Sequence, residues 1–376
     1  MRKILSIFVL LVANLLPLAS QVPTRTPDSF TNAKPGYRFS FPRDHGSHPT
    51  FRTEWWYFTG HLWNLDGSRR FGYQLTFFRQ ATPPSHKSTG KSEVQSSGSS
   101  AWRSDQIFLA HATLTDEIGK RFLVSERLNR AGLVAGAAED HLAVFNESWK
   151  AEQDDSGLIR LHLSVQGAVL DLTMQAPATP VIFGEDGVSR KGAEPTAASH
   201  YLTFPRLPAS GTLKLPNAAP IRVSGRTWMD HEFSSNQLSA DQIGWDWAGI
   251  QLREGRSLMV YRMRRKDGSQ DPFSSLTEVD AKGRITRSTR DFKVSENGSW
   301  TSPRSNTRYP QPMTFEAWGE RFTLVPLLQD QELRTDRSTG ITYWEGACRV
   351  LDGSGKEIGD AYLEQTGYAH SLKGRF

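Results

Sequence analysis

The sequence has almost no cysteine, since Cys348 is the only one in 376 residues. A chain with one cysteine cannot form an intrachain disulfide, so hydrophobic cores alone must stabilise the fold. A large excess of one charge is also missing, because 45 Lys and Arg residues stand against 40 Asp and Glu residues, for a net charge of +5. No basic stripe interleaved with aromatic residues occurs, so we expect no nucleic-acid partner.

The motifs of several common chemistries are absent. No Gly-rich loop follows a strand and opens a helix, and no Gly-x-Ser-x-Gly elbow occurs, which argues against nucleotide chemistry and against an α/β-hydrolase. His61, His111 and His231 lie on separate predicted strands without the spacing of a ligand set. We therefore expect neither a metal nor another cofactor.

A membrane-spanning hydrophobic run is lacking as well. The longest apolar run, residues 4–16, follows Arg2 and Lys3 and is shorter than the roughly 20 residues that a spanning helix needs. Pro17 and the small residues Ala19 and Ser20 end the run, so residues 1–20 are predicted to be a signal peptide, with a retained anchor as the alternative. We expect an exported protein, periplasmic or extracellular, that does not span the membrane after processing.

The chain is rich in the alternation of apolar and polar residues that is typical of half-buried strands. Clear examples are residues 55–62, 71–79, 107–115, 245–251, 257–263 and 341–350. The pattern predicts a mostly β protein. Residues 21–35 contain several prolines and are predicted to be an extended lead-in. Residues 81–104 are predicted to be a long surface loop or a disordered lid, and residues 184–198, less clearly, to be a surface loop.

Two pairs of segments resemble each other within the chain. Residues 56–62 resemble residues 246–252, and residues 225–231 resemble residues 359–365. Chance similarity between amphipathic strands is one explanation, and a duplicated module is the other. A duplication predicts an N-terminal module over residues 36–235 and a C-terminal module over residues 236–376. In each, the first strand would pair with the last, as in an up-and-down barrel.

Five motifs together carry a family resemblance: Thr53–Leu62, Leu109–Asp116, Trp228–Ser235, Gly244–Leu252, and Tyr343–Ala347 with Gly367 and Tyr368. With these motifs the chain resembles the AttH group of secreted proteins, which is similar to the carotenoid 1,2-hydratases and to kievitone hydratase. The resemblance implies two tandem lipocalin-like antiparallel β-barrels. It also implies a possible partner, an ABC-type export system, because some members are described as transport-associated. The hydratases tend to have Asp-His-Asn-Trp where this chain has Asp230, His231, Glu232 and Phe233.

Asp230 and His231 are the predicted catalytic residues. An aspartate buried among aromatic rings has a raised pKa and can donate a proton to a carbon–carbon double bond, after which His231 would act as the base for water. A buried structural ion pair at the module junction is the alternative interpretation of these two residues.

Predicted ligand-binding residues are the aromatic and acidic positions of the opening hairpins and of the first closing strand: Glu54, Trp56, Tyr57, Trp228, Trp245, Asp246, Trp247 and Tyr261. We expect them to line one pocket at the junction with Asp230 and His231, although ordinary packing of aromatic rings would also explain them. The predicted function is the binding of a lipophilic molecule, such as an isoprenoid, a polyene or a lipid-like compound. A hydratase or isomerase is the first alternative and a secreted hydrolase using Ser234 or Ser235 is the second.

Overall fold

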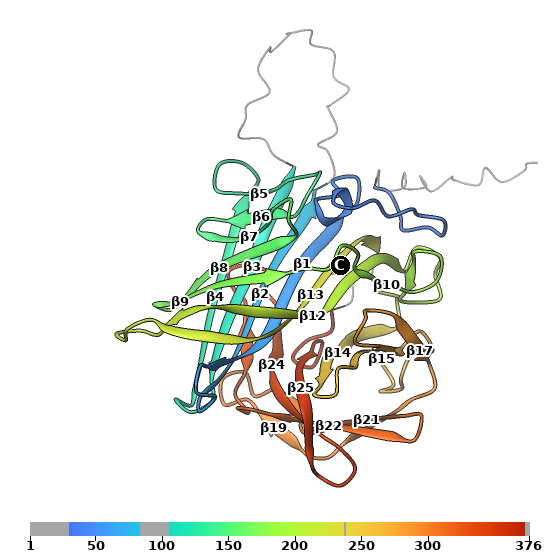
Figure 1. Ribbon diagram of the computed structural model, residues 1–376. Coiled ribbons are helices and arrows are strands. Elements are labelled where there is room, and N and C mark those ends of the chain that lie inside the picture. The colour runs from blue at the N-terminus through green and yellow to red at the C-terminus, as the bar shows by residue number, and fades with distance from the viewer. Residues whose placement is uncertain (1–29, 83–104, 237, 373–376) are drawn as a thin grey trace, which may run out of the picture.

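The computed structural model describes residues 30–82, 105–236 and 238–372 (Figure 1). The predicted signal peptide, most of the lead-in and nearly all of the predicted loop over residues 81–104 lie outside the described residues. Among the described residues, no helix has the length and hydropathy to cross a bilayer. The one helical turn described is η1 (Arg43–His45).

The first sheet is built from β1 (Thr53–Asn64), β2 (Arg70–Ala81), β3 (Gln106–Asp116), β4 (Arg121–Arg130), β5 (Ala135–Ala137), β6 (Ala143–Asn146), β7 (Trp149–Gln153), β8 (Leu158–Val165), β9 (Ala168–Gln175), β10 (Val181–Phe183), β11 (Ser189–Arg190), β12 (Ala198–Lys214) and β13 (Ile221–Asn236). Its strand order is β4-β3-β2-β1-β13-β12-β9-β8-β7-β6-β5, with β10 and β11 paired to β12. The first strand therefore pairs with the last, and the sheet curls until β3 and β4 contact β6 and β8.

The second sheet is built from β14 (Gln242–Leu252), β15 (Ser257–Arg265), β16 (Ser275–Val279), β17 (Ile285–Thr289), β18 (Lys293–Glu296), β21 (Met313–Ala317), β22 (Glu320–Pro326), β23 (Glu332–Arg334), β24 (Thr342–Leu351) and β25 (Glu357–Gln365); β19 (Ser299–Thr301) and β20 (Arg308–Pro310) form a separate hairpin. Here too the first strand pairs with the last, since β14 lies between β15 and β25. The two curled, nearly closed sheets form tandem barrel-like modules, which confirms the predicted mostly β fold of two lipocalin-like modules.

The strand register shows that the two opening strands occupy equivalent places. Tyr57 on β1 pairs with Asp230 on β13, and Trp247 on β14 pairs with Glu364 on β25. These are the same pairs that the sequence repeat aligns. Chance similarity would not put both pairs of segments into the same register, so the structure supports duplication.

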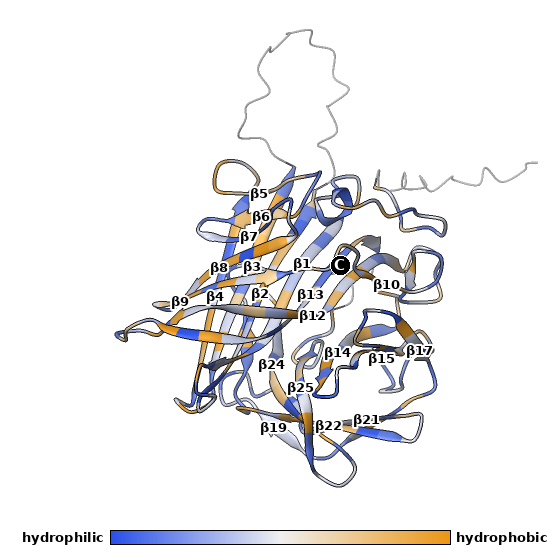
Figure 2. Cartoon of the chain, in the orientation of Figure 1, coloured by the Kyte–Doolittle hydropathy of each residue, from blue (hydrophilic) through white to orange (hydrophobic). Residues whose placement is uncertain are grey.

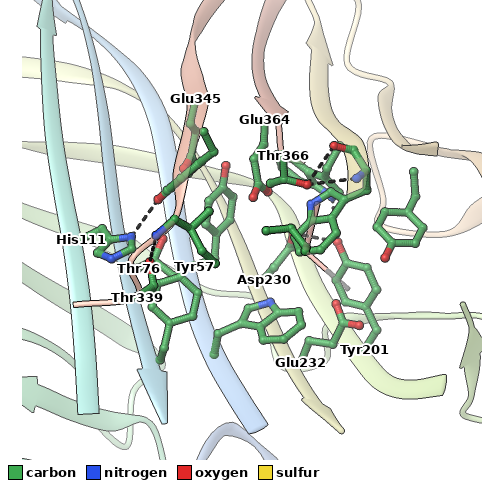
Figure 3. A pocket seen from close by; sticks show the side chains of 18 residues that line it. Tyr57, Thr76, His111, Tyr201, Asp230, Glu232, Thr339, Glu345, Glu364 and Thr366 are labelled. Carbon is green, nitrogen blue, oxygen red and sulfur yellow. Dashed lines mark hydrogen bonds between the residues drawn. The ribbon is translucent and has the colours of Figure 1, made fainter. Parts of the chain in front are cut away.

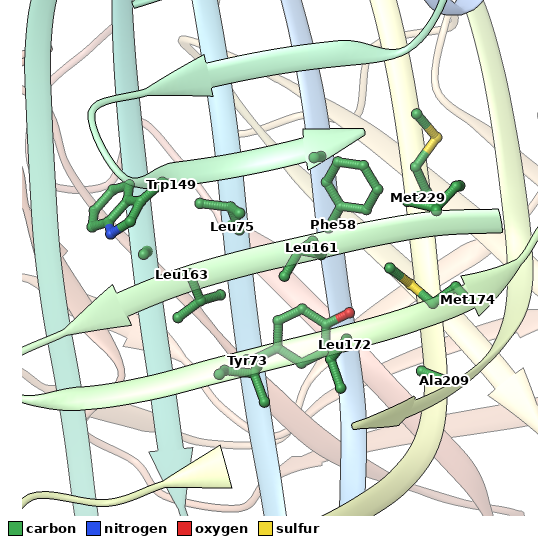
Figure 4. Packing of buried hydrophobic residues seen from close by; sticks show 14 of the residues in the cluster. Phe58, Tyr73, Leu75, Trp149, Leu161, Leu163, Leu172, Met174, Ala209 and Met229 are labelled. Carbon is green, nitrogen blue, oxygen red and sulfur yellow. The ribbon is translucent and has the colours of Figure 1, made fainter. Parts of the chain in front are cut away.

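Alternation along the strands separates two environments, as the bands of hydropathy in Figure 2 show. In the first module, one face of β1 and β2 points into the barrel, where Phe58, Tyr73 and Leu75 pack against residues from β8 and β9 that cross over them (Figure 4). Each such fully buried side chain stabilises the fold by about 1.5–3 kcal/mol. The other face of β1 and β2 is turned toward the second module.

The second module packs against that outer face. The rings of Tyr57 and Trp247 meet edge to face at 5.1 Å, and those of Trp228 and Trp247 meet at 5.7 Å. Below the rings the backbones come close, since a Cβ on Gly72 of β2 would lie 2.5 Å from the Cβ of Ala347 on β24. The neighbouring Cys348 is buried in the core of the second module.

The predicted surface loop over residues 184–198 is partly wrong. Its residues 189 and 190 form β11, which pairs with β12, and Lys191 and Ala197 are buried. The prediction failed because the segment is polar in sequence, yet its lysine is buried in an ion pair with Glu232 rather than exposed to solvent.

Candidate functional site

A cavity of about 100 Å³ lies between the two sheets (Figure 3). The first module contributes the rings of Trp55, Tyr57, Phe78 and Tyr201. The second module contributes the rings of Trp245, Trp247, Tyr261 and Tyr343. Four carboxyl groups also line the cavity, from Asp230, Glu232, Glu345 and Glu364. The site therefore combines aromatic walls with an unusual number of buried acids.

Asp230 lies on the cavity face of β13 and is held by neutral donors. The Tyr201 hydroxyl donates to Oδ2 at 2.7 Å and the Trp228 indole donates to Oδ1 at 2.7 Å. Trp247 in turn donates to the Tyr201 oxygen at 3.1 Å. Burial raises the pKa of Asp230 to about 7, against the hydrogen bonds that favour the charged form. Asp230 can thus carry a proton near neutral pH.

Glu345 and Glu364 lie directly opposite each other on β24 and β25. Burial raises the pKa of Glu364 to about 7, and burial together with the charge of Glu364 raises the pKa of Glu345 well above its usual range. Two adjacent buried carboxyl groups do not both ionise readily, because each negative charge disfavours the other.

Lys191 provides a positive charge beside this cavity. Its Nζ lies 3.0 Å from Oε1 of Glu232, and it lies over the rings of Tyr201 and Tyr261 at 4.8 and 4.2 Å from their centroids. The lysine side chain is buried. Glu232 is thereby neutralised, which leaves the other three acids without an ion-pair partner among the residues that the structure describes.

His111 on β3 lines the far wall of the cavity. Its Nδ1 is 2.8 Å from the Tyr343 hydroxyl and its Nε2 is 2.9 Å from Oγ of Ser338. Burial lowers the pKa of His111 to about 3, so the ring is neutral and serves to orient Tyr343.

His231 points away from the cavity, into the first barrel. Its Nε2 is 2.8 Å from Oε1 of Glu54, and its ring stacks on Trp56 at 4.8 Å. Glu54 also accepts bonds from Arg79 and from His48, at 2.8 Å and 2.7 Å. Burial alone would raise the pKa of Glu54, but bonds from His231 and His48 and the charge of Arg79 hold it well below its usual range. This network ties the segment before β1 to β1, β2 and β13.

Among the described residues, three side chains of this network are close enough together to hold a metal ion. Ligand atoms of His48, Glu54 and His231 lie within 4.8 Å of one another. His48 also contacts Asp44 through Nε2 at 3.1 Å, and bonds to both carboxylates raise its pKa although burial opposes this. Arg79 already pairs with Glu54 and Arg43 with Asp44, so a dication would add net charge to this site. The donor set fits a proton-sharing ion network better than a metal.

The prediction that all of these residues line one pocket is therefore wrong. Tyr57, Asp230, Trp245, Trp247 and Tyr261 line the cavity, and Trp228 supports Asp230 from behind. The residues that do not reach it are Glu54, Trp56, His231 and Asp246. Successive residues of a strand point to opposite faces, so Asp230 and His231 cannot face one ligand.

Asp246 lies inside the second barrel. It accepts a bond from Tyr368 at 3.0 Å and lies 3.2 Å from Arg262 and 3.3 Å from Arg264. It belongs to an ion network of the second module, at the position that Trp56 occupies in the first.

The predicted site lacks the charged groups Glu232, Glu345, Glu364 and Lys191. It also lacks the aromatic residues Trp55, Phe78, Tyr201 and Tyr343, and His111. The repeat contained the signal for Glu364, since it aligns that residue with Asp230. Glu345 pairs with Glu364 in the ladder, so the strand register would have found it next. Lys191 lies in a polar segment, and nothing in its sequence pattern indicates burial.

The comparisons with known proteins agree with one another. The family model described as AttH-like matches residues 32–368. A crystal structure described as an AttH from Nitrosomonas europaea is similar with a TM-score of 0.78 and 31% identity, over 90% of this chain and 100% of that one. None of the curated proteins matches the chain in sequence.

Two more distant structures share the fold. Kievitone hydratase from Nectria haematococca is similar with a TM-score of 0.64 and 12% identity, over 91% of this chain and 98% of that one. CghA in complex with Sch210972 gives a TM-score of 0.53 and 13% identity, over 92% of this chain and 97% of that one. At such identities the likeness concerns the fold. By its family match and by the Nitrosomonas structure, the chain belongs to the AttH-like family.

Proposed function

We propose that the cavity between the modules binds a lipophilic small molecule. The observation that carries this proposal is the pair of aromatic walls, one from each sheet, around a space that is not filled by side chains. Aromatic rings supply apolar area with little loss of conformational entropy, and ligand sites commonly lie between modules. Export to the periplasm or beyond, and delivery to or from an ABC-type export system, are parts of this proposal that rest on the sequence alone.

Intrinsic tryptophan fluorescence tests the binding, because Trp55, Trp245 and Trp247 line the cavity. We expect farnesol, a neutral isoprenoid, to change the emission saturably, and Trp247→Ala to weaken its binding. Trp63→Ala is the control, since Trp63 packs on Arg70 and Arg226 outside the cavity lining. Saturable binding that Trp247→Ala leaves unchanged would show that the ligand lies elsewhere.

A second function, acid-catalysed addition of water to a carbon–carbon double bond, is favoured by Asp230. Its proton would pass to one alkene carbon, and the resulting carbocation would face the aromatic walls. Water would add to the cation, and the carboxylate left on Asp230 would take the proton that the water releases. His231 takes no part in this scheme, because it lies on the other face of β13. The fold shared with kievitone hydratase supports this second proposal.

Mass spectrometry in 18O-labelled water separates the two functions. A hydratase would convert a bound isoprenoid into a labelled alcohol, and Asp230→Asn would abolish this while keeping the binding. If a set of isoprenoid alkenes binds but none incorporates the label, the protein has the binding function and not the hydratase function.

A further inference from the structure

Three of the four acids in the cavity have no cation beside them. Asp230, Glu345 and Glu364 form no ion pair with any residue that the structure describes, while Glu232 has Lys191. The other titratable side chains facing the cavity are tyrosines and His111, and His111 is neutral at ordinary pH. The cavity thus holds more potential negative charge than the protein itself balances.

Two polar atoms on the wall are also unsatisfied. Oε1 of Glu345 and the hydroxyl of Tyr57 are buried and have no hydrogen bond of standard geometry, and each makes a looser polar contact with the other. Glu345 is 1% exposed and Tyr57 is 7% exposed, and both line the cavity. A buried polar atom without a well-formed hydrogen bond costs free energy, so a ligand that contacts these two atoms would be stabilised by them.

Lys191 shows how the same wall accommodates a positive charge. Its ammonium lies against one carboxylate, Glu232, and over two tyrosine rings at 4.8 and 4.2 Å. Tyr201 and Tyr261 therefore already act as cation–π partners at one end of the cavity. At the other end, Tyr57 and Trp247 offer rings beside Glu345 and Glu364, but no lysine or arginine of the described chain is there.

From this contrast we propose that the cavity is built to hold one organic cation, an apolar molecule with a single ammonium group, between Glu345, Glu364 and the rings of Tyr57 and Trp247. This deepens the proposed function and depends on it for the location of the site. An anion would be repelled by the acids, whereas a cation balances the charge of the acids that ionise. Aromatic rings with nearby carboxylates recognise ammonium groups in general. The carboxyl groups of Asp230 and Glu364, with pKa values of about 7, can ionise when a cation arrives.

Two probes of the same shape test the proposal, benzyltrimethylammonium and its neutral carbon analogue neopentylbenzene. Binding to the full exported chain is followed by tryptophan fluorescence and by calorimetry. We expect the cation to bind at least about tenfold more tightly than the neutral analogue, the scale of a desolvated cation–π contact. Phenylacetate, an anion, should not compete.

Glu345→Gln and Glu364→Gln should each reduce the affinity for the cation and leave that for neopentylbenzene unchanged. Glu139→Gln is the matched control, since Glu139 is exposed and outside the cavity lining. Thermal unfolding checks that the variants fold. Equal or tighter binding of neopentylbenzene to the wild type overturns the cation proposal and leaves the proposed function standing. If the Gln variants keep the preference for the cation, the assignment to these acids is wrong. If neither probe nor farnesol binds, the proposed function fails as well.

Discussion

Asp230 and His231 are neighbours in sequence but belong to different chemical environments. One carboxyl faces a cavity with neutral donors, and the imidazole faces a closed ion network inside the first barrel. The alternation of a strand separates them, and this could be stated from the sequence as soon as the segment was assigned as β. The raised pKa of Asp230 was also foreseeable, because burial among aromatic rings disfavours the charge. Its partners Tyr201 and Trp228 became known only from the structure.

Asp230→Asn should change how stability depends on pH. In the folded protein the pKa of Asp230 is about 7, whereas an unfolded aspartate has a pKa of about 3.9. Between these values the folded state binds the proton and the unfolded state does not, so wild-type stability should fall by about 1.4 kcal/mol per pH unit as pH rises. The variant lacks this titration, so its stability relative to wild type should rise from pH 4 to 7 and then level off. Urea unfolding across that range measures the difference, and a constant difference would contradict it.

Glu54→Gln should destabilise the protein without affecting the cavity. The change weakens the acceptor of His48, Arg79 and His231, and it leaves the buried Arg79 without its counter-charge. Breaking a buried pair in this way costs about 3–5 kcal/mol. The midpoint of urea unfolding should move to a lower urea concentration, while the control Glu139→Gln should keep the wild-type midpoint. Probe binding by the folded variant should match wild type, and weaker binding would mean that the two sites communicate.

At the scale of elements, β13 is one strand with two roles, since one face closes the cavity and the other closes the barrel. The position of β13 beside β1 was predictable from the repeat, because both opening and closing segments recur in order. The packing of the two sheets on each other was not predictable in detail, because it joins residues some 300 positions apart, such as His61 and Ala361. No local pattern encodes that contact.

Gly72→Ala should push the sheets apart at the contact between β2 and β24. The new methyl group would lie 2.5 Å from the Cβ of Ala347 and 3.3 Å from the Tyr362 hydroxyl. Overpacking of this kind typically costs about 1–3 kcal/mol. Gly353→Ala is the control, since its nearest neighbour would be the Cβ of Arg321 at 4.0 Å. We expect a lower melting temperature and altered probe affinity for Gly72→Ala only, and unchanged values would show that the contact yields without cost.

For the whole molecule, duplication explains why the site lies where it does. Each module presents the outer face of its first and last strands to the other, so the equivalent residues Asp230 and Glu364 line the same cavity and their charges interact. The two copies have diverged, since Glu364 stands at the place of Asp230 and Gln365 at the place of His231. Neither barrel encloses the cavity alone.

The N-terminus of the chain is expected to be removed on export. We expect the exported chain to begin near Gln21 or Val22, because the short apolar run ends in small residues there. Intact-mass measurement of protein recovered from the periplasm or medium checks this. A mass that includes residues 1–20 would indicate a retained anchor.

The lone cysteine gives the molecule a built-in reporter. Cys348 is buried on β24 in the core of the second module, and burial raises the pKa of its thiol far above neutrality. Thiol reagents react with the exposed thiolate, so the folded chain should resist labelling and each labelled molecule should record an opening of that core. The labelling rate therefore measures how often the second module opens, and a bound ligand should slow it. A second cysteine placed at the cavity rim would take a fluorophore selectively, because the native thiol is protected.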